Sequence, residues 1–540
     1  MPLRPLARRL GPTKASPFFC RCSSIHSSAI QRKRPALPFL SAPTTAPTTS
    51  PSTGRRFTSA QKQWFKHEMK LAFRYTTTFC GCVLAALGIN YAINQEAIER
   101  EFPTPPEWSF LTRKRLRDAH HEDRPRLAKA YLSARAAIAR LEKSESSSQN
   151  LVKLADPPDP KVEYPEEFIP YDISANSEDW RRGYFEALMF SAKAGQVLEG
   201  HLLDVTRDFI FPPEYVIGPS NPRPKPIPPG APSAPLERNC RLAYPPFEHH
   251  YIKMLATEGF SPRQRVDAAL EFAAAVQSKG KLDAAEALYT LALKEATRNI
   301  EPAHLPYDTK TLILKDGGEP PSANILEALT AMANFKARTG QLSSALPMYV
   351  SLLKARRCLS DTPPPPAISN SPPPSTMQRM LDYFKPPPYP KSPGDGTEPP
   401  WRNSLGRCQE AALHLYIGEI LYATSSRVDG LAWTRDAVDL SEEQLRAGEV
   451  DKETKQRCRE CLATGLNNWS AMVAQLAQAE KAKKKTGVKR IIPFWQKAEE
   501  TESRWGSEQA VVVDRVKRTR ELLVDPTPIP SRDLISFFTA

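Results

Sequence analysis

Residues 280–293, GKLDAAEALYTLAL, predict a tight turn that leads into a helix. Gly280 permits the positive φ that a short connection between two helices needs. Ala285 and Ala292 are small where the two helices would approach closely, and Tyr289 can fill the gap between them. The preceding segment offers apolar residues at matching offsets: Phe272, Ala273 and Val276. We therefore predict a helical hairpin with its turn at Gly280.

The same pattern returns in residues 340–353, GQLSSALPMYVSLL, after a segment that carries Leu329, Met332 and Ala333. Helix–turn–helix pairs of this kind are typical of tetratricopeptide (TPR) repeats, whose usual period is about 34 residues. Gly280 and Gly340 are 60 residues apart, and this longer spacing predicts an insertion over residues 300–322. Pro347 should kink the second helix or mark a late start, because proline lacks the N–H that a helix interior needs.

The C-terminal part of the chain carries a less regular third copy, in residues 417–421 and 430–438, in which Gly430 takes the place of the turn glycine. Residues 456–479 form a fourth helical element, and residues 495–523 close the array. We predict an all-α protein in which residues 247–362 and 403–523 form a TPR-like helical-repeat (α-solenoid) domain. An unrelated helical bundle is the alternative.

Residues 109–209 predict a further helical segment, with helices over 109–118, 124–143 and 177–209 and a polar linker over 144–165. The second helix has an amphipathic stripe at three- and four-residue steps: Leu127, Tyr131, Ala134, Ile138 and Leu141. Ser177 is the predicted N-cap of the third helix, since Glu178 and Asp179 follow it in the first turn.

Two proline-rich regions separate the helical segments. Residues 212–235 hold ten prolines, and residues 363–400 hold fourteen. Such density excludes helix and central strand. We predict a polyproline-type linker over 210–246 and a partly disordered insertion over 363–402, with residues 524–540 forming a tail.

The N-terminal 67 residues contain twelve Lys/Arg and no acidic residue, and the first acid is Glu68. The rest of the chain has 62 Lys/Arg and 60 Asp/Glu, so almost all of the +14 net charge comes from this leader. A nearly neutral body argues against nucleic acid as a partner. An Arg- and Ser-rich, acid-poor leader is typical of a mitochondrial presequence, which we place at residues 1–57; a disordered basic arm is the alternative.

Residues 75–93 form the one long uncharged apolar run. At about 1.5 Å per residue, this run covers roughly 28 Å, close to the thickness of a hydrocarbon core. Lys70 and Arg74 precede it, and Glu96 and Glu99 follow it. We predict a transmembrane helix with its N-terminal side in the matrix and the C-terminal domain in the intermembrane space. A buried helix of a soluble domain is the alternative.

The nine cysteines form no recognisable disulfide framework. Cys458 and Cys461 lie one helical turn apart without a second ligand pair, so we interpret them as two buried small residues rather than as a metal site. The sequence carries none of the common phosphate-binding, hydrolase or zinc-protease motifs. We therefore predict no enzyme activity, no cofactor, no metal and no small-molecule substrate.

A basic presequence, a single span at 75–93 and TPR-like repeats at 280–293 and 340–353 together resemble the TPR-containing adaptor subunit of the mitochondrial inner-membrane i-AAA protease supercomplex, in its fungal form. The resemblance covers residues 57 to about 523. It implies a protein that binds polypeptides in the intermembrane space and delivers them to a membrane protease.

Protein partners should bind in the groove of the repeats, for which the candidate residues are Asn334, Arg338, Glu419 and Tyr422. The large TPR receptor of the outer-membrane import machinery is a rival, but its Lys/Asn carboxylate clamp would fall on Leu270 and Ala274. An assembly factor for a respiratory complex is a second hypothesis. An enzyme with an unrecognised cleft is the third.

Overall fold

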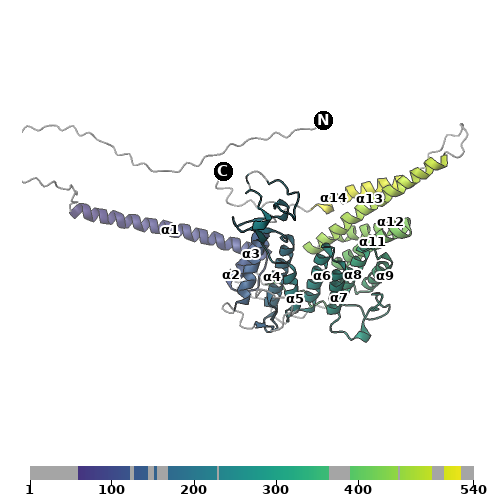
Figure 1. The fold of residues 1–540 in the computed structure, drawn as a ribbon, viewed down its shortest axis with the longest axis horizontal. Helices are drawn as coiled ribbons and strands as arrows, with labels where there is room; N and C mark the ends of the chain where they lie inside the picture. Colours follow the sequence, from purple (N-terminus) through teal and green to yellow (C-terminus); the bar gives the residue numbers. More distant parts are fainter. Residues whose placement is uncertain are drawn as a thin grey trace, which may run out of the picture. The chain divides into compact units, whose positions relative to one another are not determined.

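The computed structural model describes residues 59–121, 127–143, 151–154, 168–227, 230, 232–363, 389–447, 450–488 and 504–524. Over these residues the protein is all-α, with one long apolar helix followed by a packed helical domain and with strands confined to two small sheets (Figure 1). The predicted presequence, residues 364–388 of the predicted insertion and residues 525–540 of the tail lie outside the described residues. Contacts divide the chain into a unit ending at Ala85 and a unit beginning at Ala86.

Helix α1 (Ser59–Glu101) contains the predicted span and extends beyond it at both ends. None of its residues is buried. Phe79 is 70% exposed and Leu84 is 68% exposed, although both side chains are strongly apolar. By length and composition, α1 could cross a membrane.

The C-terminal end of α1 is held by α2 (Phe110–His121). Glu99 accepts a hydrogen bond from Arg117 at 2.8 Å and also pairs with Arg113. Phe102, just past the helix, stacks on His120 with ring centroids 5.4 Å apart. These contacts fix α2 against the last turns of α1.

Helix α3 (Leu127–Glu142) packs on α2 and on α4 (Glu178–Val197) through the predicted stripe. Ser177 is the N-cap of α4, and its hydroxyl accepts a hydrogen bond from the Trp180 N–H at 3.2 Å. Helix α4 ends at Val197, so the predicted helix to residue 209 is too long. Gly200, at φ 76°, begins the turn away from the helix.

Beyond α4, where we predicted further helix up to residue 209, the chain forms short antiparallel strands. β3 (Leu202–Asp204) pairs with both β4 (Phe209–Phe211) and β5 (Cys240–Leu242). The chain from β4 to β5 is therefore a closed loop and not the extended linker that we predicted over 210–246. Ile217 pairs with Leu236 at the neck of this loop, and the Asn221 amide donates to the Pro213, Glu214 and Val216 carbonyls. A two-stranded pair, β1 (Val152–Lys153) with β2 (Tyr171–Asp172), lies earlier in the chain.

After α5 (Glu248–Ala256), two helical hairpins form where the sequence predicts them. They are α6 (Pro262–Ser278) with α7 (Leu282–Ala296), and α8 (Ala323–Arg338) with α9 (Leu342–Arg357). Gly280 and Gly340 take φ values of 75° and 84° in the two turns. The predicted small residues Ala285 and Ala292 are fully buried. Burial of these faces joins both hairpins into one continuous core.

Two further details concern the second hairpin and the insertion that we predicted before it. Helix α9 begins at Leu342, so Pro347 lies inside the helix and does not mark a late start. Residues 300–322 form an excursion between α7 and α8, closed by a Tyr307–Leu314 bridge with both side chains buried.

The third hairpin, α11 (Ser404–Thr424) with α12 (Arg427–Arg446), uses Gly430 differently from our prediction. Gly430 lies within α12 and faces Gly418 of α11, and the turn falls at Ser425 and Ser426. A Cβ on Gly430 would lie 2.5 Å from the Tyr422 nitrogen and 2.6 Å from the Gly418 oxygen. The two glycines therefore allow the helices to cross in backbone contact.

Helix α13 (Lys452–Val488) covers this hairpin, and α14 (Arg504–Leu523) packs on α12 and α13. The apolar side chains predicted on α13 form a second core with Leu431, Val438 and Val512: Leu462, Leu466, Trp469, Met472 and Leu476.

The described end of the proline-rich insertion, for which we predicted partial disorder, makes defined contacts with the helices. The Gly396 and Glu398 carbonyls accept hydrogen bonds from the free N–H groups of Asn324 and Ala323 at the start of α8. The Tyr389 ring lies 4.1 Å from the guanidinium carbon of Arg182 on α4. This segment, residues 389–400, which we call the strap, thus connects α4, the start of α8 and the start of α11.

Candidate functional site

A groove of about 740 Å³ runs across the first helices of the successive hairpins. Its walls come from α4, α6, α8, α11 and α13, with one residue, Arg356, from α9. The second helices α7 and α12 contribute nothing to it. Its lining includes Lys193, Arg263, Asp267, Leu270, Glu271, Ala274, Glu327, Asn334, Arg356, Gln409, Tyr416, Glu419, Arg457, Glu460 and Cys461.

The groove follows from helical periodicity. On each first helix, lining residues recur at three- and four-residue steps, as in Asp267, Leu270 and Ala274 of α6. The opposite faces of these helices are apolar and pack on the second helices. One face of each first helix is thus left to form a shared surface, and that surface mixes polar and apolar side chains.

Most charges in the groove are paired with each other. Lys193 contacts Glu271 at 2.6 Å. Arg263 contacts Asp267 at 3.2 Å and Glu327 at 2.5 Å, so it connects α6 to α8. The Lys193–Glu271 and Arg263–Glu327 pairs therefore connect neighbouring helices of the groove wall.

Asp267 is the most perturbed acid in the groove. Partial burial raises its pKa to about 6, and this effect outweighs the attraction of Arg263. Glu327 and Glu271 add to the shift because their charges repel that of Asp267. The charge of the groove therefore changes within the pH range 5 to 7.

Arg356 lies deepest among the groove cations, with only 6% of its surface exposed. Its Nη1 donates to the Gln409 Oε1 at 2.6 Å, while its Nε has no hydrogen-bond partner. Burial lowers the pKa of its guanidinium. Sequence patterns did not single out this residue, because it lies on a second helix and reaches the groove between α8 and α11.

A smaller hollow of about 390 Å³ brings together three of the four predicted binding residues, Asn334, Arg338 and Glu419. Tyr349 donates its hydroxyl to the Asn334 Oδ1 at 2.7 Å and stacks on Tyr416, with ring centroids 5.2 Å apart. Asn334 and Glu419 line the groove as well, so the two hollows are continuous there.

Tyr422, the fourth predicted residue, is not among the residues that line either hollow. Its hydroxyl donates to the Met472 carbonyl at 3.0 Å and contacts the Gln475 Oε1 at 3.2 Å. It therefore connects α11 to α13. The clamp positions of the rival receptor, Leu270 and Ala274, do line the groove, and neither can bind a carboxylate through its side chain.

A disulfide joins Cys408 of α11 to Cys458 of α13, with Cα atoms 5.2 Å apart. Cys458 is buried, as we interpreted it, but it is also disulfide-bonded, which the spacing of the cysteines did not indicate. Cys461, one turn further along α13, donates its thiol to the Cys408 carbonyl at 3.5 Å. Burial raises the pKa of Cys461 to about 11, which keeps it protonated and unreactive at neutral pH.

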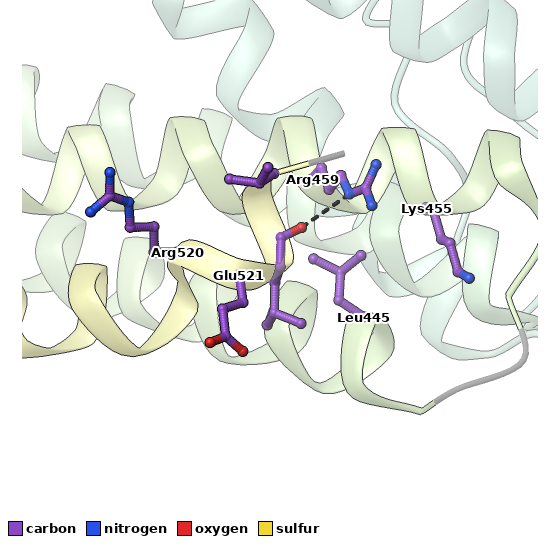
Figure 2. Close-up of a pocket in the computed structure, with 7 residues that line it drawn as sticks. Leu445, Lys455, Arg459, Arg520 and Glu521 are labelled. Atoms are coloured by element: carbon purple, nitrogen blue, oxygen red, sulfur yellow. Dashed lines mark hydrogen bonds between the residues drawn. The ribbon is translucent and has the colours of Figure 1, made fainter. Parts of the chain in front are cut away.

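A separate cavity of about 600 Å³ lies where α14 ends against α12 and α13 (Figure 2). Figure 2 shows Arg459 of α13 pointing at the last turn of α14, and its Nε donates to the Leu522 carbonyl at 3.0 Å. A cation at the C-terminal carbonyls of a helix stabilises that end. We therefore interpret this cavity as part of the docking of α14. Within the described residues, no cluster of three or more His, Cys, Asp or Glu could hold a metal ion.

Comparison with known proteins adds little. No protein-family model and no curated protein matches the chain. Among solved structures, BtubC (BKLC) from P. vanneervenii is similar at 14% identity and a TM-score of 0.30, over 66% of this chain and 87% of that one. A likeness of this size carries no argument about function.

Proposed function

We propose that this protein is a membrane-anchored, non-enzymatic adaptor whose groove binds extended segments of other polypeptides. One observation carries the proposal: five helices, α4, α6, α8, α11 and α13, each leave one mixed polar and apolar face toward a shared groove of about 740 Å³. A peptide in such a groove gains apolar contact together with hydrogen bonds from fixed side chains. The groove charges are largely paired with each other, which suits polypeptide better than a polyanion.

The hairpins support a TPR-like array. The first two hairpins each have a short turn with its glycine, a small residue at the helix crossing and a buried tyrosine, and the first helix of all three hairpins contributes to the groove. This is the arrangement in which solenoid repeats form extended binding surfaces.

We place the protein in the mitochondrial inner membrane, with its N-terminus in the matrix and the groove in the intermembrane space. The acid-free leader supports a mitochondrial location. Lys70 and Arg74, which precede the apolar run, support an N-terminus on the matrix side. The buried Cys408–Cys458 disulfide supports a compartment that permits oxidation.

The resemblance to the i-AAA adaptor subunit suggests that the bound segments belong to proteins destined for a membrane protease. The full-length chain, purified from mitochondria in mild detergent, tests this. We expect an AAA protease and its substrates to co-purify. Their consistent absence would refute the adaptor role.

A matched pair of variants separates groove binding from membrane association. Ala274→Arg places a long cation on an exposed groove position of α6. Ala287→Arg makes the same change on an exposed position of α7, outside the groove. Loss of co-purifying substrates in A274R but not in A287R would support the groove as the binding site, and equal loss in both would argue against it.

A further inference from the structure

Arg356 is a buried cation without a counter-charge. No carboxylate oxygen of the described residues lies within the 4.0 Å of an ion pair, and its Nε donates to nothing. Its one hydrogen bond goes to the neutral amide of Gln409. An unpaired buried charge is costly, and native structures rarely keep one without a reason.

The surrounding acids are already engaged. Glu327 pairs with Arg263, and Glu410 accepts two hydrogen bonds from Arg402, at 2.6 and 2.8 Å. Asp267 also pairs with Arg263. The attraction of Glu327 and Glu410 reaches Arg356 only at longer range. A further carboxylate would therefore find the guanidinium of Arg356 available.

Arg356 borders two adjoining hollows. One is the groove, and the other is a space of about 200 Å³ between α8, α11 and the end of the strap. The smaller hollow is walled by Trp401 and Asn403, which makes it a side pocket of the groove large enough for a single side chain. Three cations and two acids line it: Arg263, Arg356, Arg402, Glu327 and Glu410.

The position of Arg356 favours an internal residue of the ligand over a chain end. Residues of α4 and α6 line the groove on one side of it, and residues of α13 line it on the other. A chain that ended at Arg356 would leave one of these halves empty. A chain that passes through would place one side chain opposite the side pocket.

We propose that Arg356 receives the carboxylate of an internal Asp or Glu of the polypeptide bound in the groove, and that Gln409 orients the guanidinium for this contact. This inference rests on the proposed polypeptide-binding function and specifies its ligand. Guanidinium binds carboxylate through two parallel hydrogen bonds, which a lysine in the same place would not reproduce.

The test uses the full-length chain in detergent and a displayed library of random twelve-residue peptides that have no free C-terminus. We expect the wild-type chain to enrich peptides with Asp or Glu at one position. Arg356→Gln should lose this preference and keep the apolar ones. Arg357→Gln is the matched control, because Arg357 is the exposed next residue of α9 and lines neither hollow, so this variant should keep the acidic preference.

An enriched peptide is then synthesised with its acid as Glu or as Gln, and with its C-terminus as acid or as amide. We expect at least tenfold weaker binding for the Gln peptide on the wild-type chain, a ratio near one on R356Q, and no effect of the C-terminus. A stronger effect of the C-terminus than of the internal acid would overturn the proposal in favour of a carboxylate end.

If R356Q does not fold, Arg356→Lys takes its place, and it should reduce the Glu-to-Gln ratio because lysine lacks the planar fork. Equal binding of the Glu and Gln peptides to the wild-type chain overturns the proposal whatever the variants do. If the wild-type chain retains peptides but shows no preference for Asp or Glu, this inference is refuted and the proposed function is not. Retention of no peptide by the wild-type chain would defeat the proposed function and this inference with it.

Discussion

The Cys408–Cys458 disulfide should account for a large share of the stability of the α11–α13 region. The bond closes a loop with a sequence separation of 50, which contains the whole of α12. In the chain-entropy model, a loop of this length stabilises the folded state by about 4 kcal/mol, because the bond restricts the unfolded chain. Both cysteines are buried.

Hydrogen exchange of the amides in the first turns of α13 measures this effect locally. We expect reduction to accelerate their exchange on the order of a thousandfold, which corresponds to about 4 kcal/mol. Cys458→Ala should do the same and add a smaller loss from the missing sulfur. Cys461→Ala is the control, because its thiol forms only one long hydrogen bond.

Peptide mapping without reductant checks the premise, and it should recover Cys408 linked to Cys458. The reasoning fails if the linked pair is Cys458–Cys461, or if reduction changes exchange in α13 by less than about threefold. The latter result would mean that packing of the second core, and not the closed loop, limits the opening of α13.

Three further predictions concern other parts of the chain. In a denaturant titration, Gly430→Ala should lower the free energy of unfolding by about 1–3 kcal/mol, because its Cβ would meet the α11 backbone at 2.5 Å. Gly318→Ala is the control and should be neutral, since a Cβ there meets nothing within 4 Å. Burial holds the pKa of His250 at about 3, below its unfolded value near 6.5. The neutral ring therefore contributes its full stability above pH 6.5, and this contribution is lost as the pH falls toward 3, by about 2 kcal/mol between pH 7 and 5. His250→Gln should remove this pH dependence of stability from thermal melts. The basic residues before the span are Lys62, Lys66, Lys70 and Arg74. Exchanging them for Gln should weaken the preferred orientation, so that protease protection of a C-terminal tag in mitoplasts becomes mixed. An unchanged protection pattern would contradict the orientation rule.

The hairpins at Gly280 and Gly340 were predictable because their cause is local. A glycine in a turn, an alanine five positions later and a tyrosine four positions after that determine a helix crossing without help from distant chain. Gly430 was misplaced for the opposite reason. Glycine at a turn and glycine at a close crossing look alike in sequence, and only the neighbouring backbone of Gly418 distinguishes them.

The groove was only partly predictable. Asn334 and Glu419 were expected there because they lie on the free faces of first helices. Tyr422, on the same helix as Glu419, turns toward α13 instead. Arg356 was missed because a long side chain on a second helix can pass between two first helices, and helical periodicity contains no information about that passage.

The sequence by itself determined the class of the protein: a basic leader, one apolar run long enough to cross a bilayer, and hairpins with glycine turns. These features depend on composition and on spacings of a few residues, which act over one or two helical turns. The tertiary structure alone decided that Cys408 meets Cys458, that the strap covers the start of α8, and that Arg356 is buried with an unpartnered Nε. Each of these depends on the packing of helices that are distant in sequence, since a side chain's partners and its exposure to water exist only after the helices have packed.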